Sequence, residues 1–198
     1  MSPRAKKVKS TRIRILDGAE EYLRLHGPEE LTIVAVAERL NMSHANVYKY
    51  FNNKAELQQE VVERWLEEIT KPLKKICEAK DEPAAGRVRS WLHELARIRS
   101  EKMRSDPGLF RAFLEHPEPE RDAAEGHYEE MIQQVAEILW QGEMNNEWQK
   151  QAFDAEAKAL LDASAVYLHP YFLMYAPKEP WEMDSLLDWF ILALQAEK

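Results

Sequence analysis

Apolar side chains recur every three to four positions along almost the whole chain, which is the spacing of helices with one buried face. Alternation of apolar and polar residues, which is typical of β-strands, is rare. The first stripe, within residues 11–25, consists of Ile15, Leu16, Ala19, Tyr22 and Leu23. The pattern therefore predicts an all-α protein.

Capping residues and helix breakers divide the first part of the chain. Gly27-Pro28 stops the first helix, and Thr32 caps a short second helix whose apolar positions include Val36 and Leu40. Asn41-Met42 then forms a tight turn. A short helix followed at once by a tight turn indicates that another helix packs against it.

Two further helices follow this turn. Ser43 caps a third helix that we expect to end near Phe51. Asn53 caps a fourth, and Glu56 stands three residues later, where a capping box requires a glutamate. Pro72 is expected to end or kink the fourth helix, because proline has no backbone N–H to donate.

The remainder of the chain predicts a second group of helices, separated by a charged linker at residues 118–122. They cover residues 84–105, a short segment with Phe110, Phe113 and Leu114, a segment that ends at Gly142, a long Ala-rich segment from Asn145 or Asn146 to His169, and a last helix from Pro180.

Three short helices near the N-terminus, with the second and third separated by a few residues, form a helix-turn-helix pattern. The second helix must brace the third through apolar contacts, here from Val36, Ala37 and Leu40 to Val47 and Phe51. The third then presents its remaining side chains to base edges in a major groove about 12 Å wide. These side chains are His44, Ala45, Asn46, Tyr48, Lys49 and Tyr50.

Charge is distributed unevenly along the chain. The whole chain has 27 Lys+Arg, 35 Asp+Glu and a net charge of −8, which by itself argues against nucleic acid binding. Residues 1–60, however, hold ten basic and eight acidic side chains, so their net charge is +2 and that of the rest is −10. This asymmetry favours an N-terminal end that faces a polyanion; a solvated, disordered basic tail is the alternative.

Several protein classes are not indicated. The single cysteine, Cys77, excludes an intrachain disulfide and a cysteine-cluster metal site. No Gly-x-Gly-x-x-Gly or P-loop is present, so no cofactor is expected. No apolar run reaches the roughly 18–20 residues of a membrane span, and no signal-peptide stretch stands at the N-terminus. We expect a soluble cytoplasmic protein with no membrane partner.

The segments LTIVAVAERL at residues 31–40, NMS at 41–43 and VYKYFNNKAEL at 47–57 resemble the DNA-binding domain of the TetR family of transcriptional regulators. The specific part is Tyr48-x-Tyr50-Phe51-x-x-Lys54-x-x-Leu57, and the similarity covers roughly residues 10–60. Asn41 stands where many members have glycine, a mild departure because asparagine tolerates the left-handed conformation.

This resemblance implies a fold and a domain organisation. A flexible basic tail at residues 1–10 would precede a three-helix helix-turn-helix domain at 11–57, and a helical regulatory and dimerisation domain would occupy 58–198. The implied function is that of a ligand-responsive, sequence-specific DNA-binding regulator, a repressor released from its operator by a small molecule. The implied partners are double-stranded operator DNA, a second copy of the chain and an unidentified effector.

Roles at the DNA follow from the same resemblance, position by position. The implied phosphate-binding residues are Thr32, Ser43, Tyr50 and Lys54, the base-facing residues are His44, Ala45, Asn46 and Tyr48, and Lys49 serves either role. The alternative for Thr32 and Ser43 is that they are helix caps alone, and for the two tyrosines it is packing in the core.

In this family the second domain commonly holds a small-molecule pocket and the dimer interface. Candidate pocket walls are Trp91, Phe110, Phe113, Tyr128, Met131 and Tyr167, with Trp140 and Tyr171 as further walls and His93, His127 and His169 as polar anchors. Such walls imply an apolar or aromatic effector, and plain core is the alternative for each side chain. The acidic surplus hints at a cationic effector, for which ordinary surface glutamates are the alternative explanation and the one we favour. The expected interface combines residues 151–167 with Leu186, Leu187, Phe190, Ile191 and Leu194.

Two other functions are weighed against this one. A ligand-blind DNA-binding or scaffolding protein would use its second domain for dimerisation alone. An enzyme on a helical bundle is disfavoured because no Glu-x-x-His pair and no Gly-x-Ser-x-Gly motif occur. We therefore expect no enzymatic activity, no catalytic residues and no metal site.

Overall fold

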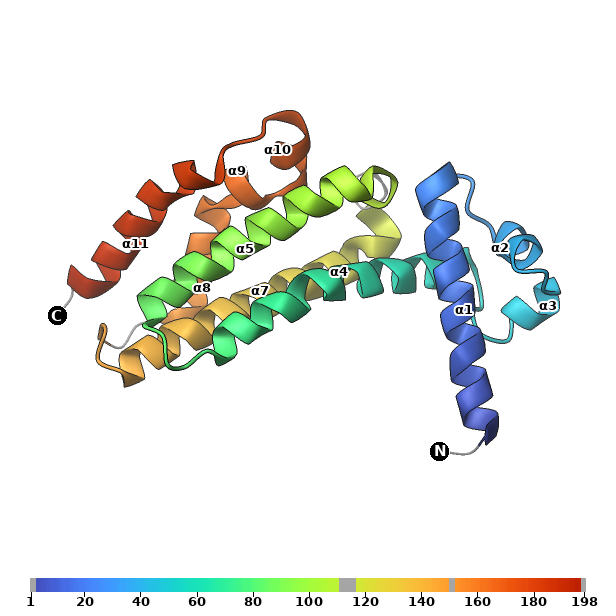
Figure 1. Cartoon of the computed structure of the whole chain (residues 1–198), viewed down its shortest axis with the longest axis horizontal. Coiled ribbons are helices and arrows are strands. Elements are labelled where there is room, and N and C mark those ends of the chain that lie inside the picture. Colours follow the sequence, from blue (N-terminus) through green and yellow to red (C-terminus); the bar gives the residue numbers. More distant parts are fainter. Residues whose placement is uncertain (1–2, 111–116, 150–151, 197–198) are drawn as a thin grey trace. The chain divides into compact units, whose positions relative to one another are not determined.

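The structure, a computed structural model, describes residues 3–110, 117–149 and 152–196. These residues form helices joined by loops, and none of them lies in a β-strand (Figure 1). Contacts divide the chain into two compact units. The first comprises Met1–Trp65 and Asp106–Ala124, and the second comprises Leu66–Ser105 and Glu125–Lys198.

The first unit contains the predicted helix-turn-helix. Its helices are α1 (Pro3–His26), α2 (Ile33–Arg39), α3 (His44–Val47) and the first part of α4 (Lys54–Glu78). The start of α1 at Pro3 precedes the start predicted at residue 11. The prediction that the third helix ends near Phe51 is wrong, because α3 ends at Val47 and residues 48–50 form turns.

A continuous apolar core holds these helices together. Of the predicted stripe on α1, Ile15, Ala19 and Leu23 have no exposed surface, whereas Leu16 and Tyr22 are half-buried. Of the residues expected to brace the helix-turn-helix, Val36, Ala37, Val47 and Phe51 are fully buried, whereas Leu40 is half-buried. α2 and α3 are in contact.

The connections in this unit use the predicted capping residues. The Ala35 backbone N–H donates to Oγ1 of Thr32 at 3.0 Å, as an N-cap requires. Asn41 has a φ of 51°, and its left-handed conformation lets the chain turn towards α3. The capping box at α4 differs in detail: the Glu56 N–H donates to Asn53 Oδ1, whereas the Glu56 carboxylate accepts from Asn52.

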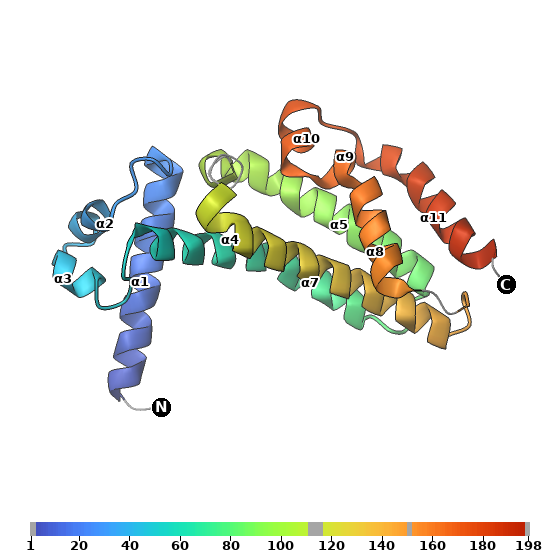
Figure 2. The same ribbon diagram turned by 180° about the vertical axis from the view of Figure 1, so that it is seen from behind.

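The second unit is a helical bundle. Its helices are the later part of α4, α5 (Ala84–Ser105), most of α7 (Pro117–Met144), α8 (Phe153–Ala163), α9 (Ala165–Leu168), α10 (Pro170–Tyr175), the 3-10 turn η1 (Pro180–Met183) and α11 (Asp184–Ala196). Seen from behind, α5 and α7 run alongside the later part of α4 (Figure 2). Among the described helices, none combines the length and apolar character that a membrane span requires.

Three helix boundaries in this region differ from those predicted. Pro72 does not end α4, which continues to Glu78. The expected charged linker at residues 118–122 belongs to α7. The long helix predicted from Asn145 or Asn146 to His169 begins instead at Phe153 and is divided at Ser164.

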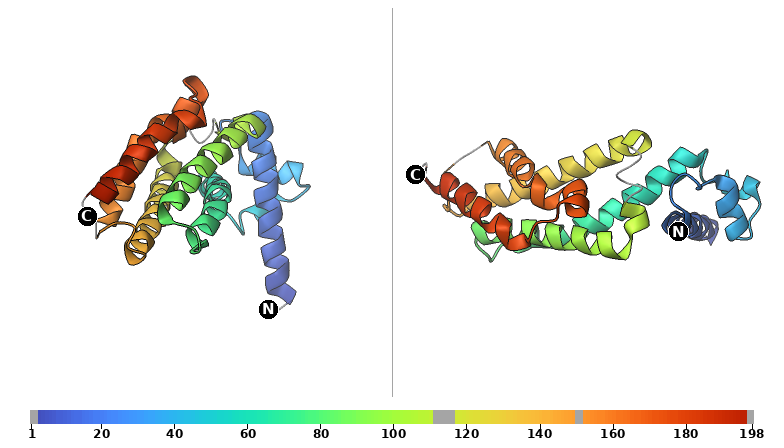
Figure 3. Two further views of the ribbon diagram at one scale, coloured as in Figure 1. Left: turned by 60° about the vertical axis from the view of Figure 1, so that its left-hand side comes forward. Right: turned by 90° about the horizontal axis from the view of Figure 1, so that it is seen from above.

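Polar contacts fix α11 on the outside of this bundle. Arg89 Nη1 on α5 donates to Asp184 Oδ1 at 2.8 Å, and its other terminal nitrogen bonds Asp188. His93 Nε2 lies 2.8 Å from the same Asp184 oxygen. Figure 3 shows α11 and α5 side by side. Trp189 and Leu192 on the same helix are exposed.

Replacing Phe51 by alanine is expected to lower the free energy of unfolding by about 3–5 kcal/mol, because a fully buried ring is removed from the core of the first unit. Tyr48 is the matched control: its side chain is 51% exposed, so Tyr48→Ala should change stability by roughly 0.5 kcal/mol or less. Urea unfolding followed by circular dichroism measures both. Equal losses for the two variants would contradict this assignment of the core.

Candidate functional site

A small polar surface projects from α3 and the turn after it. His44, Ala45, Tyr48 and Lys49 are exposed and Asn46 is half-buried. We call these five residues the recognition face. They surround Val47, which is fully buried, so the same short segment contacts the core on one side and presents its polar side chains on the other.

The residues expected to bind phosphates differ in their exposure and in their hydrogen bonds. Thr32 is exposed and caps α2. Ser43 is exposed at the N-cap of α3, and its side chain makes no capping hydrogen bond. Tyr50 is half-buried. The Thr32 hydroxyl oxygen already accepts a hydrogen bond, whereas the Ser43 side chain is not committed to a cap.

Lys54 has an internal role that the sequence did not indicate. Its ammonium nitrogen donates to the carbonyl oxygens of Pro28 at 2.9 Å and Glu29 at 3.3 Å. These carbonyls belong to the loop between α1 and α2. Lys54 therefore ties the start of α4 to that loop, and one of its three N–H donors is left for another acceptor.

Arg12 contacts Tyr50 and Phe51, which follow the recognition face in the chain. Its Nη1 donates to the Tyr50 carbonyl oxygen at 2.8 Å, and its guanidinium carbon lies 4.6 Å from the centre of the Phe51 ring. A salt bridge to Glu60 completes its contacts. Residues Tyr50 and Phe51 are thus attached to α1 through Arg12, and Arg12 is in turn paired with α4.

The described candidate pocket walls are divided between the two units. Trp91 and Met131 are buried in the second unit, and the Trp91 indole donates to Gln134 at 3.0 Å. Phe110 is buried in the first unit, 6.0 Å from the Trp65 ring. Phe113 lies outside the described residues.

Two tyrosines of the candidate set form hydrogen bonds on the second unit. The hydroxyl of Tyr128 donates to Asp162; burial is the main cause that raises the Tyr128 pKa above its ordinary value, and Asp162 raises it further. The hydroxyl of Tyr167 donates to the Glu182 carbonyl at 3.2 Å. Both phenols are occupied by the protein itself.

A buried basic group lies near His127. The Arg99 side chain is 8% exposed; it donates to the Leu168 carbonyl at 2.8 Å and lies 3.4 Å from His127 Nε2. Burial, followed by the nearby positive charge, lowers the pKa of His127 to about 3. Burial also lowers the pKa of Arg99 to about 10. His127 is thus a neutral acceptor for Arg99 near pH 7.

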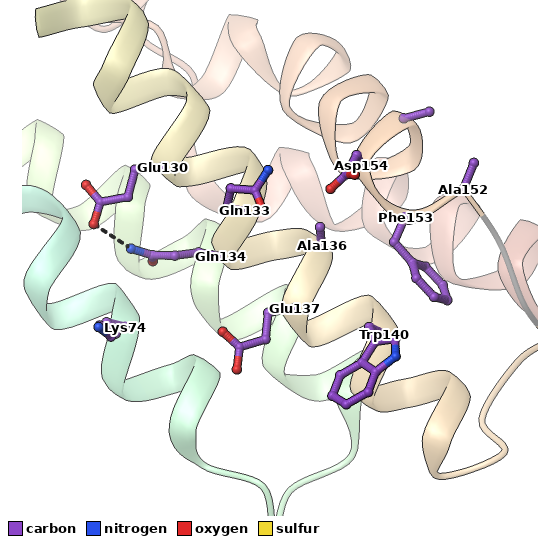
Figure 4. A pocket seen from close by; sticks show the side chains of 11 residues that line it. Lys74, Glu130, Gln133, Gln134, Ala136, Glu137, Trp140, Ala152, Phe153 and Asp154 are labelled. Carbon is purple, nitrogen blue, oxygen red and sulfur yellow. Dashed lines mark hydrogen bonds between the residues drawn. The ribbon is translucent and has the colours of Figure 1, made fainter.

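A groove of about 790 Å³ opens on the second unit between α4, α7 and α8 (Figure 4). Its lining consists of Lys74, Glu130, Gln133, Gln134, Ala136, Glu137, Trp140, Ala152, Phe153, Asp154 and Ala155. Of the aromatic residues suggested by the sequence, Trp140 contributes to this groove. The described members of the main candidate set, from Trp91 to Tyr167, do not line it.

The sequence does contain a signal for this groove. Glu130 and Gln134 are four residues apart, and Glu137 and Gln141 repeat that spacing seven residues later. A seven-residue separation returns to the same face of a helix, so both pairs lie along one side of α7. No group of three or more metal-ligating side chains occurs among the described residues.

Comparison with known proteins gives consistent matches to both parts of the chain. The model of bacterial regulatory proteins of the tetR family matches residues 15–61. The model of the tetracyclin repressor-like C-terminal domain matches residues 84–185. No curated protein matches the sequence.

Solved structures share the fold at low sequence identity. A transcriptional regulator from Pseudomonas aeruginosa PAO1 has a TM-score of 0.73 at 13% identity, over 95% of this chain and 91% of that one. A TetR-family regulator from Mesorhizobium loti has a TM-score of 0.70 at 16% identity, over 98% and 97%. The SmeT–triclosan complex has a TM-score of 0.66 at 20% identity, over 93% and 91%.

Replacing Lys54 by methionine, which keeps much of the apolar stem, is expected to lower the free energy of unfolding by about 1.5–3 kcal/mol, because hydrogen bonds from a charged donor are lost. Lys49→Met is the control, since Lys49 is exposed on the recognition face. Urea unfolding of the DNA-free protein measures both. A Lys54 variant as stable as the control would show that the loop does not depend on this contact.

Proposed function

Because the chain belongs to the TetR family of transcriptional regulators, we propose that it is a repressor that binds operator DNA as a homodimer and is released by a small molecule. The observation that carries the proposal is the recognition face: five neighbouring residues project from a segment whose other side is buried at Val47 and Phe51. A helix-turn-helix presents side chains to a major groove in this manner.

The proposed contacts divide into two kinds. His44, Ala45, Asn46 and Tyr48 would face base edges, where the Asn46 amide can pair with adenine and His44 can donate to guanine. The phosphate contacts would be made by Ser43, Thr32 and Tyr50, with Lys49 serving either role. Lys54 would use its remaining N–H for a phosphate while it holds the α1–α2 loop.

The direct test is selection of an operator. Purified protein is mixed with fragmented genomic DNA, and the bound fragments are sequenced and footprinted. We expect a palindromic site whose half-sites are about 34 Å apart, or one turn of B-DNA. Failure to enrich any palindrome would contradict the proposal.

Replacing Asn46 by alanine is expected to reduce discrimination between operator and altered operator by about 1–3 kcal/mol, because a base-reading amide is removed. Lys49→Ala provides the comparison: if Lys49 binds phosphate, this change weakens binding to all duplexes and reduces the salt dependence. Fluorescence anisotropy with operator and random duplexes measures both. Equal losses on the two duplexes for Asn46→Ala would show that Asn46 does not read bases.

The surface proposed for dimerisation lies on α8 and α11. Ala159 and Ala163 of α8 are exposed, as are Trp189 at 76% and Leu192 at 63% on α11. Small residues allow helices to approach closely, and large exposed apolar side chains favour burial against a partner. Leu187 and Leu194, expected from the sequence at the interface, are buried in the core of their own chain.

Replacing Trp189 by aspartate is therefore expected to convert the dimer to a monomer and to abolish operator binding, because a charge enters an apolar interface. Sedimentation velocity and anisotropy measure the two effects. Tyr175→Asp is the control, since Tyr175 is also exposed, at 63%, but lies on α10. An unchanged dimer in the Trp189 variant would exclude this surface.

An effector bound to the second unit can change DNA binding by the first unit only if the chain connects the two. α4 contributes to both units, and the chain passes from the second unit to the first between Ser105 and Asp106. The segment after this point packs on α1: Arg24 Nε donates to Asp106 at 2.6 Å, and a Cβ on Gly108 would lie 3.0 Å from the Arg24 carbonyl oxygen. An effector that favours one arrangement of α5 would act on α1 through this segment.

A further inference from the structure

The groove between α4, α7 and α8 carries a negative charge. Glu130, Glu137 and Asp154 are exposed along its lining, against the single basic side chain of Lys74, so the lining has a net charge of −2. Glu130 and Glu137 are seven residues apart on α7, which separates them by about 10 Å along the helix. Asp154 belongs to α8, and Figure 4 shows it across from the α7 residues.

Buried donors fix the orientation of the two α7 carboxylates. The indole of Trp91 donates to Gln134 Oε1 at 3.0 Å, so the amide nitrogen of Gln134 must point the other way, where it donates to Glu130 at 3.4 Å. An indole N–H can only donate, which leaves no choice in the amide orientation. The carboxylate of Glu130 thus accepts a hydrogen bond from Gln134, whose orientation is set by Trp91.

The same arrangement recurs one heptad later. The fully buried Arg87 donates to Gln141 Oε1, and Gln141 Nε2 donates to Glu137 Oε1 at 3.0 Å. A guanidinium also can only donate. The groove therefore has two exposed carboxylates, each of which accepts a hydrogen bond from a glutamine that a buried donor orients.

Aromatic side chains complete the lining. The Trp140 side chain is 49% exposed, and Phe153 is half-buried beside it in the groove. The faces of such rings attract cations and pack against flat apolar groups. A volume of about 790 Å³ lies within the range of roughly 300–1,000 Å³ that small-molecule sites occupy.

We propose that this groove binds an organic cation with an aromatic or apolar body, with Glu130, Glu137 and Asp154 facing its positive charge and Trp140 and Phe153 its body. Charge complementarity selects this ligand class: an anion would meet three carboxylates and one ammonium. The inference rests on the proposed function in one respect, namely that the bound cation acts as the effector.

Two probes of matched shape and opposite charge test the groove itself. Isothermal titration calorimetry is carried out on the full-length protein without DNA, using tetraphenylphosphonium and tetraphenylborate. Saturable binding of the phosphonium and none of the borate supports the proposal. Equal binding of both, or no phosphonium binding at millimolar concentration, overturns it.

Charge-removing variants locate the site. Glu130→Gln and Glu137→Gln should each weaken phosphonium binding by up to about fivefold, and together by about an order of magnitude, as expected for exposed charge pairs. Glu67→Gln is the matched control, because Glu67 pairs with Lys71 on α4 outside the groove. A double variant that binds the phosphonium as tightly as this control overturns the assignment.

A gel shift separates this inference from the proposed function. Release of operator by phosphonium from the parent protein, but not from the Glu130→Gln/Glu137→Gln variant, supports the groove as the effector site. Binding of the cation without any release overturns its effector role. A protein that selects no operator at all overturns the proposed function and leaves the calorimetric result standing.

Discussion

The burial of Val47 and Phe51 is the constraint on which the DNA-binding half of the molecule depends. These side chains are four residues apart, and both have no exposed surface. With those two positions fixed against α2 and α1, His44, Tyr48 and Lys49 can only point outwards. Arg12 and Lys54 add polar ties at the two sides of this segment, so its position relative to α1 and α4 is set by both packing and hydrogen bonds.

Much of this half could be predicted from the sequence, because its signals are local. The Thr32 cap and the turn at Asn41 each depend on a residue type whose conformational preference is strong. The internal contacts of Lys54 could not be predicted in the same way. Its carbonyl partners, Pro28 and Glu29, lie more than twenty residues away and became neighbours through tertiary packing.

The errors in the second half also have physical causes. Pro72 does not end α4 because Ile69, Leu73 and Cys77 on either side of it are buried, and their packing outweighs the lost backbone hydrogen bond. The break between α8 and α9 at Ser164 could not be predicted, because no glycine or proline stands at that position. An aromatic stripe at helical spacing fits a core and a pocket equally well, so the position of Phe110 in the first unit could not be inferred from its spacing.

Charge in the second unit has two different structural roles. Many of its exposed carboxylates pair with bases on the same helix: Glu94 bonds Arg97 at 2.7 Å, and Asp162 bonds Lys158 at 2.6 Å. Such surface pairs sum to no net charge and imply no ligand. Glu130 and Glu137 are different, because buried donors hold them through glutamine amides. A total charge cannot distinguish these two arrangements, whereas the hydrogen bonds beneath each carboxylate do.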